Sequence, residues 1–335
     1  MRKWLLWLAV LAVLAFLLWW AFRKAPLAEI WAAIRQLRGW QIAVLLALNG
    51  IFYGVTTLRW WIILRADNNH IPFLPLLGVR VSVFGVSYFT LGPQVGGEPL
   101  MVLALQKRYG LTYTHATATV LMDKLLEFLV NFLMLAIGLT AILRVGVLAE
   151  SRLQFSGDLL LLAFLVLWPP IHLILLYNHH YPVSALVSRI PFIKKNSKPL
   201  RFLRAAEWLA GRFCQRHPSR LLAAIGCSLL AGAGMLLDYA LMTAFLNIHL
   251  TFWKMTAGWS LGWISLIMPL PGGLGALEAS QVFILGRFGF SAAAALSLTL
   301  LMRGRDMLIG GLGLLLAGTG WNRKAKPLSA GRRKE

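Results

Sequence analysis

The chain has 335 residues, of which 59% are hydrophobic and 13% charged, and its mean hydropathy is +0.70. A soluble domain of this length needs more polar surface, so the composition excludes a soluble catalytic domain and predicts that lipid surrounds most of the chain. The net charge of +21 does not indicate nucleic-acid binding, because the basic residues cluster in short stretches between apolar runs. That distribution is the positive-inside pattern of membrane proteins. Two cysteines, Cys214 and Cys227, are too few for a disulfide framework or a zinc site.

The N-terminal apolar run, residues 4–22, is long enough to cross a hydrocarbon core of roughly 30 Å. No small-residue cleavage site precedes Arg23–Pro26, so we predict a retained anchor and not a signal peptide. The next segment, residues 27–38, has apolar side chains at helical spacing, which predicts a short amphipathic helix on the membrane interface.

Seven further apolar runs follow, at about 41–64, 73–91, 117–143, 158–177, 221–247, 255–270 and 291–318. Two of them end in stretches rich in proline and glycine, at Leu91–Pro99 and Pro269–Gly275. Proline lacks the amide donor and glycine disfavours a helix interior, so neither run continues as a helix. Irregular backbone at membrane depth survives only where protein or a water-filled cavity satisfies it. We therefore predict two re-entrant hairpins, at about 73–105 and 255–287, with tips near Gly92–Gly97 and Pro271–Gly275.

The predicted fold is all-α: one integral membrane domain, residues 1–335, forming a polytopic helical bundle of about six to eight transmembrane helices. With six full spans and both termini in the cytoplasm, the inside segments hold 20 Lys or Arg and the outside segments hold 8. The basic loop 178–220 and the basic tail 319–335 then lie on the same side of the inner membrane. An eight-span arrangement stays open. The helix expected within 178–220 either binds anionic phospholipid headgroups or only fixes the topology.

Eleven charged side chains fall inside the membrane-embedded runs, and each costs roughly 2.5–3.5 kcal/mol at a helix centre. They must therefore pair with one another or face water. Arg59 and Arg80 are interpreted as snorkelling to an interface, and Asp238 stays open between a satisfied interior acid and a functional one. The six acids and five bases are Glu98, Asp123, Glu127, Asp238, Glu278, Asp306, Arg59, Arg80, Lys124, Arg303 and Arg305.

The order of a break, an acid and then a charged span occurs twice. Asp123 and Lys124 follow Glu98, and Arg303, Arg305 and Asp306 follow Glu278, at a spacing of about 25 residues in both cases. Because the two hairpins enter from opposite sides, this pattern is typical of an inverted repeat whose broken helices meet near the midplane. We expect Glu98, Asp123, Lys124, Glu278 and Arg303 to converge around one polar cavity, with at least one acid–base pair in contact.

Two stretches carry a resemblance to a known family. Pro271-Gly-Gly-Leu-Gly-Ala-Leu-Glu278-Ala279 resembles the P-G-G-x-G-x-x-E-A signature of the lysylphosphatidylglycerol synthase transmembrane-region family, the flippase-like integral membrane proteins. Gly97-Glu98 and the helix with Asp123, Lys124 and Glu127 resemble its other region, with Lys124 where arginine is common. From the charge pattern and the resemblance together, we predict substrate-binding or translocation roles for Gly97, Glu98, Asp123, Lys124, Glu127, Pro271, Gly272, Gly273, Gly275, Glu278, Arg303, Arg305 and Asp306.

Family members that make aminoacylated lipid carry a soluble synthase domain after the membrane part, whereas this sequence ends at Glu335 after a short basic tail. The resemblance thus implies a flippase that moves a phospholipid or lipid-linked headgroup, with no catalytic residues, metal or cofactor. The sequence has no G-x-x-x-x-G-K-[ST] loop for ATP. Two alternatives remain: a membrane partner of a lipid-modifying or glycosyltransferase enzyme, and an enzyme acting on a lipid phosphate.

Overall fold

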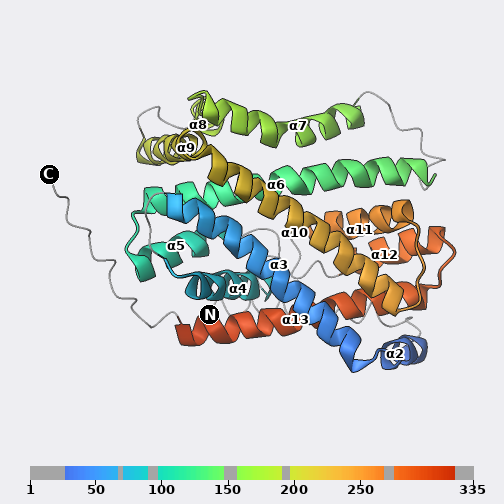
Figure 1. Cartoon of the computed structure of the whole chain (residues 1–335). Helices are drawn as coiled ribbons and strands as arrows, with labels where there is room; N and C mark the ends of the chain where they lie inside the picture. Colours follow the sequence, from blue (N-terminus) through green and yellow to red (C-terminus); the bar gives the residue numbers. More distant parts are fainter. Residues whose placement is uncertain are drawn as a thin grey trace, which may run out of the picture.

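The computed structural model describes residues 27–66, 71–89, 97–146, 157–190, 197–267 and 275–320. Within these ranges every regular element is a helix, which confirms the all-α prediction (Figure 1). The predicted first span at 4–22 and most of the basic tail lie outside the described residues, as do residues 92–96 and 271–274 of the predicted tips at Gly92–Gly97 and Pro271–Gly275. The amphipathic helix expected at 27–38 is α2, Leu27–Arg35.

Three helices, α3 (Gly39–Ala66), α6 (Tyr113–Arg144) and α10 (Pro218–Phe245), are long and apolar enough to cross a membrane. At 1.5 Å per residue they are about 42–48 Å long, which exceeds the hydrocarbon thickness and permits tilt. The helix α13 (Ala292–Gly320) is of similar length and carries three charged residues near its middle. The helix α7 (Gly157–Tyr177) covers the remaining predicted span and contains Pro169 and Pro170. The long helices cross one another in Figure 1, with α3 packed along α10.

Each predicted hairpin is a pair of short helices. The first pair is α4 (Phe73–Phe89) with α5 (Glu98–Tyr109), and the second is α11 (Phe252–Ile267) with α12 (Ala276–Arg287). The first member of each pair is only about 24–26 Å long, which falls short of a full hydrocarbon core. Local capping interactions explain where the second helix of each pair ends or begins. Gly110 ends α5 in the left-handed conformation at φ 69°, and Glu278 accepts the backbone N–H of Gly275 at 2.9 Å at the start of α12.

Each pair begins and ends at the same end of the bundle. Ile71 and Leu76, at the start of α4, share one core cluster with Tyr109 and Leu111, which close α5. In the other pair, the Lys254 ammonium near the start of α11 lies 5.3 Å from the ring centre of Phe288, which follows α12. Figure 1 shows α4 and α5 in one half of the bundle and α11 and α12 in the other. This is the arrangement that two oppositely inserted hairpins require, although insertion itself stays a prediction.

The close contact of α4 with α13 depends on glycine. A Cβ built on Gly85 would lie 2.8 Å from the backbone N of Leu314 and would also collide with the carbonyl oxygen of Gly310. Without side chains at this crossing the two backbones approach closely, as at small-residue crossings in membrane bundles. The contact places the C-terminal end of α4 beside the middle of α13, where the charged residues lie.

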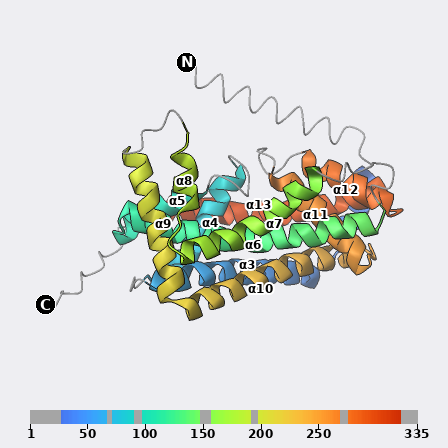
Figure 2. The ribbon, with the colours of Figure 1, turned by 90° about the horizontal axis from the view of Figure 1, so that it is seen from above.

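The helix α9 (Lys198–Arg216) runs steeply across the long helices at the end of the bundle where α3 ends (Figures 1 and 2). Arg201, Arg204 and Trp208 are exposed along one side of it, and the guanidinium of Arg212 lies 4.7 Å from the Trp208 ring centre. Its opposite side is buried against α6 and α7, together with the short helix α8 (Pro182–Val187). The predicted amphipathic helix within 178–220 is therefore confirmed.

A buried carboxylate fixes this corner. Glu207 of α9 is fully buried and accepts the backbone N–H groups of Val183 at 2.9 Å and Ser184 at 2.8 Å, while Nε2 of His172 lies 3.7 Å away. Burial alone raises the pKa of the Glu207 carboxyl, but its interactions with His172 and these backbone groups hold that pKa below its usual value. The charged form of Glu207 therefore stabilises the contact between α8 and α9.

The outer surface of the long helices is apolar. Leu222, Leu229 and Leu237 are exposed along α10 at spacings of seven and eight residues, and Leu308, Leu312 and Leu315 are exposed on α13 at spacings of four and three residues. Such stripes put apolar side chains on one face of a helix. In a soluble protein they would promote association, whereas in a bilayer they contact lipid chains.

Candidate functional site

Asp123 is the centre of a buried charge network between the helices. Its carboxylate is fully buried and accepts Nε of Arg59 at 2.7 Å and Nη2 of Arg80 at 2.5 Å. Arg59, on α3, also donates from Nη2 to Glu127 at 3.1 Å and from Nη1 to Ser228 of α10 at 3.1 Å. One guanidinium thus ties α3 to α6 and α10, and the geometry satisfies charges that would be costly alone.

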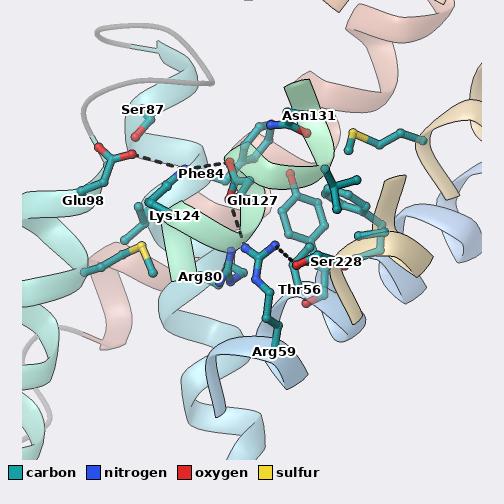
Figure 3. A pocket seen from close by; sticks show the side chains of 18 of the residues that line it. Thr56, Arg59, Arg80, Phe84, Ser87, Glu98, Lys124, Glu127, Asn131 and Ser228 are labelled. Atoms are coloured by element: carbon teal, nitrogen blue, oxygen red, sulfur yellow. Dashed lines mark hydrogen bonds and ion pairs between the residues drawn. The ribbon is translucent and has the colours of Figure 1, made fainter. Parts of the chain in front are cut away.

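Lys124 extends the network towards the first hairpin. Its ammonium lies 2.9 Å from Glu127 and 3.3 Å from Glu98, the first residue of α5 (Figure 3). The predicted acid–base contact is confirmed, but not between the adjacent Asp123 and Lys124. Neighbouring positions on a helix point about 100° apart, so Asp123 faces the arginines while Lys124 faces α5. Glu127 lies one turn beyond Asp123 and Lys124 and contacts both Arg59 and Lys124.

These side chains border a cavity of about 150 Å³, which we call the Lys124 cavity. Its wall comes from α3, α4, α5, α6, α10 and α11, so all three long apolar helices contribute (Figure 3). Apolar side chains form part of it, including Phe52, Phe84 and Met235. The polar lining residues are Tyr53, Thr56, Arg59, Arg80, Ser87, Glu98, Lys124, Glu127, Asn131, Ser228 and Trp263.

A second charge cluster joins α10 to α13. The guanidinium of Arg305 donates from Nε and Nη2 to Asp306 at 2.8 and 2.7 Å, and from Nη1 to Asp238. Asn49 of α3 donates to the other oxygen of Asp238 at 3.2 Å. Asp238 is therefore a paired interior acid. A cavity of about 140 Å³, the Asp238 cavity, is bordered by these four residues.

The third cluster holds the second hairpin against α13. Glu278 accepts Nη2 of Arg303 at 3.0 Å and also Nε of the same guanidinium, in a bidentate pair. Both side chains are buried, and Glu278 caps α12 as well. The linings of the Lys124 and Asp238 cavities include neither residue.

The expectation of a single cavity for all five predicted residues is therefore wrong. Glu98 and Lys124 line the Lys124 cavity, Asp123 lies behind its arginines, and Glu278 with Arg303 forms a separate pair. The reason is helix geometry. Asp123 and Lys124 are adjacent on α6, hence about 100° apart around its axis, and face different partners, while Arg303 of α13 is held by Glu278.

The interpretation of Arg59 and Arg80 as snorkelling side chains is also wrong. Arg59 is 1% exposed and Arg80 contacts Asp123, so both arginines neutralise the interior. The sequence did contain a signal for this pairing. Six embedded acids require embedded partners, and Lys124, Arg303 and Arg305 alone supply only half of the positive charge.

The two halves of the chain repeat one contact. Glu98 follows the first break and pairs with Lys124 of the next long helix, and Glu278 follows the second break and pairs with Arg303. Residues 7–313 match the family model of the lysylphosphatidylglycerol synthase TM region. The chain belongs to this family.

The family's breadth is evident from a distant relative. The chain is 24% identical over 328 residues to a UPF0104 membrane protein of Pyrococcus horikoshii, with 90% of this chain and 92% of the relative covered. No solved structure matches the chain. As a member of the lysylphosphatidylglycerol synthase TM-region family, it is a polytopic membrane protein.

The family resemblance can now be located in the structure. Gly97 packs against α4, since a Cβ there would lie 2.6 Å from Val83 and 2.8 Å from Oγ of Ser87. Gly275 has φ 80°, a conformation that glycine adopts readily, and its N–H caps onto Glu278. Pro271, Gly272 and Gly273 lie outside the described residues.

Proposed function

We propose that this protein moves the polar headgroup of a phospholipid, or of another lipid-linked compound, between the leaflets of the inner membrane. The observation that carries the proposal is the Lys124 cavity, which is lined by ionised side chains and enclosed among long apolar helices. Ionisable residues at membrane depth are costly and are typical of substrate paths. A headgroup could enter such a cavity while its acyl chains stay in the surrounding lipid.

The Asp238 cavity extends the proposed path. It shares five lining residues with the Lys124 cavity: Phe52, Tyr53, Phe84, Met235 and Trp263. A mainly aromatic partition therefore separates two polar compartments. Movement of these side chains would join the compartments without exposing either ion-pair cluster to the lipid chains.

Glu98 is the network's most adaptable acid. Its side chain is 32% exposed and lies 3.3 Å from Lys124, whereas Glu278 is fixed by Arg303 and by its cap. A partly exposed carboxylate can bind a cationic group or take up a proton and so couple movement to a proton gradient. In this proposal, Glu98 responds to the substrate and Glu278 positions the second hairpin.

The proposed orientation has both termini in the cytoplasm. In that orientation α9 lies on the cytoplasmic surface, and its exposed arginines meet anionic phospholipid headgroups. The alternative is a membrane subunit that serves a lipid-modifying or glycosyltransferase enzyme. The family model supports this alternative, because its description names the membrane region of a synthase.

A leaflet-resolved assay tests the proposal. The purified protein is reconstituted into liposomes that contain fluorescently labelled phosphatidylglycerol, and a membrane-impermeant quencher measures the label in the outer leaflet over time. We expect faster exchange between leaflets than in protein-free liposomes, and loss of that gain in Glu98→Gln. The control is Glu150→Gln, an acid between the predicted apolar runs 117–143 and 158–177.

The outcomes separate the candidates. Exchange equal to that of protein-free liposomes, across phosphatidylglycerol, phosphatidylethanolamine and a polyprenyl phosphate, would contradict a flippase. A lipid-modifying activity in membranes that depends on the chain would then support the partner role. Normal exchange by Glu98→Gln would leave transport intact and remove this carboxylate from the mechanism.

A further inference from the structure

Three hydrogen-bond donors in the wall of the Lys124 cavity have no acceptor among the residues that the structure describes. They are Nε of Arg80, Oγ of Ser87 and Nε1 of Trp263. Ser87 is 5% exposed and Trp263 is 6% exposed. Buried donors are nearly always satisfied, because an unpaired one loses its bonds to water without compensation. Three of them on one cavity indicate that a ligand supplies the acceptors.

The three cations of this cavity differ in whether their donor groups already bind protein acceptors. Arg59 donates from all three of its nitrogens, to Asp123, Glu127 and Ser228. Lys124 contacts two carboxylates, those of Glu98 and Glu127. Arg80 donates from Nη2 to Asp123, and its Nε has no acceptor in the described part of the chain. Arg80 is therefore the cation that is positioned to bind an anion without breaking the network.

The three donors also set the shape of the ligand. Arg80 and Ser87 are seven residues apart on α4, which places them on one face of the helix and about 10 Å apart along its axis. Trp263 approaches from α11, in the other hairpin. The ligand must therefore offer acceptor oxygens at more than one point, as a phosphate ester with further ester or hydroxyl oxygens does.

We propose that the Lys124 cavity binds a lipid phosphate ester through these donors. Arg80 Nε donates to a phosphate oxygen, and Ser87 Oγ and Trp263 Nε1 donate to oxygens elsewhere in the headgroup. The inference rests on the proposed function and names the chemistry of its substrate. It also assigns binding residues that the family motifs do not contain, since none of the three lies in either of the two matching stretches.

Equilibrium binding tests this assignment separately from transport. Dihexanoyl phosphatidylglycerol is titrated into the purified full-length protein in mild detergent and its binding is measured by calorimetry. Dihexanoylglycerol, which lacks the phosphate, and inorganic phosphate, which lacks the lipid, are titrated in parallel. We expect saturable binding of the phospholipid, and at least tenfold weaker binding of the other two.

Three variants each remove one donor while nearly keeping the side-chain volume: Ser87→Ala, Trp263→Phe and Arg80→Lys. Lysine keeps the charge opposite Asp123 but lacks the Nε donor. Each variant should weaken phospholipid binding about tenfold, as expected for one hydrogen bond to a charged or strongly polar group. Matched controls are Ser260→Ala and Trp60→Phe, whose buried donors are also unpaired but lie outside this cavity.

Each other result overturns the assignment. Equal binding of inorganic phosphate would show a free-anion site, and equal binding of dihexanoylglycerol would show an apolar site. Unchanged phospholipid binding in all three donor variants, or equal losses in the two controls, would show that these donors do not contact the ligand. Transport by the wild-type protein in the liposome assay would still stand in that case, so the two proposals fail separately.

Discussion

Replacing Asp123 by asparagine tests whether the buried network holds the bundle together. The variant keeps the shape of the side chain but removes a charge that two arginines share at 2.7 and 2.5 Å. Six side chains form this network, three cations and three acids, so the variant leaves one uncompensated positive charge inside the membrane. Removing one partner of a buried ion pair costs about 3–5 kcal/mol. That is a large share of a typical net stability of about 5–15 kcal/mol.

Equilibrium unfolding in sodium dodecyl sulfate, followed by tryptophan fluorescence, measures this loss. The double variant Asp123→Asn/Arg80→Gln removes one acid and one cation and so restores the neutrality of the network. Arg59 keeps its hydrogen bonds to Glu127 and Ser228. We expect the double variant to be more stable than Asp123→Asn alone, with a coupling of about 1–3 kcal/mol. A loss below about 1 kcal/mol for the single variant, or simple additivity in the double, would refute the reasoning.

Three further predictions use the same unfolding measurement. Glu278→Gln should destabilise by about 3 kcal/mol or more, because it removes the carboxylate charge that faces the buried Arg303 guanidinium and weakens the cap of α12; a loss near zero would contradict this. Gly85→Ala should cost about 1–3 kcal/mol by overpacking the α4–α13 crossing, whereas Gly78→Ala on the same helix meets open space and should be neutral. Since its pKa is lowered in the folded state, Glu207 should stabilise the fold above its unfolded pKa of about 4.3. The stability difference between wild type and Glu207→Gln should therefore shrink as the pH falls through the folded pKa, and a pH-independent difference would exclude this role.

The family relationship and the charge chemistry narrow the proposed role in complementary ways. The family model covers nearly all of the described helices and shows a membrane protein of the lysylphosphatidylglycerol synthase TM-region family. The unpaired donors of the Lys124 cavity then give a structural reason to expect a phosphate ester, and they name the residues proposed to bind it. The binding and exchange assays address these two levels separately.

Much of this protein was predictable from local properties of the sequence. Apolar run lengths predicted the long helices, and proline with glycine predicted that the runs 73–91 and 255–270 end early, as α4 and α11 do. These features depend only on backbone hydrogen bonding and on transfer to lipid, which act over one or two turns of chain. The need for embedded charges to pair followed from the same reasoning.

The choice of partners was decided only by the tertiary structure. Arg59 pairs with Asp123 across 64 residues of sequence, and Arg305 pairs with Asp238 across 67. Such a choice depends on the rotation of each helix about its axis and on which helices cross. Neither is encoded in spacing along one helix. For that reason the sequence predicted one cavity around five residues, whereas packing distributes them among separate clusters and brings Arg80, Ser87 and Trp263 to a single cavity wall.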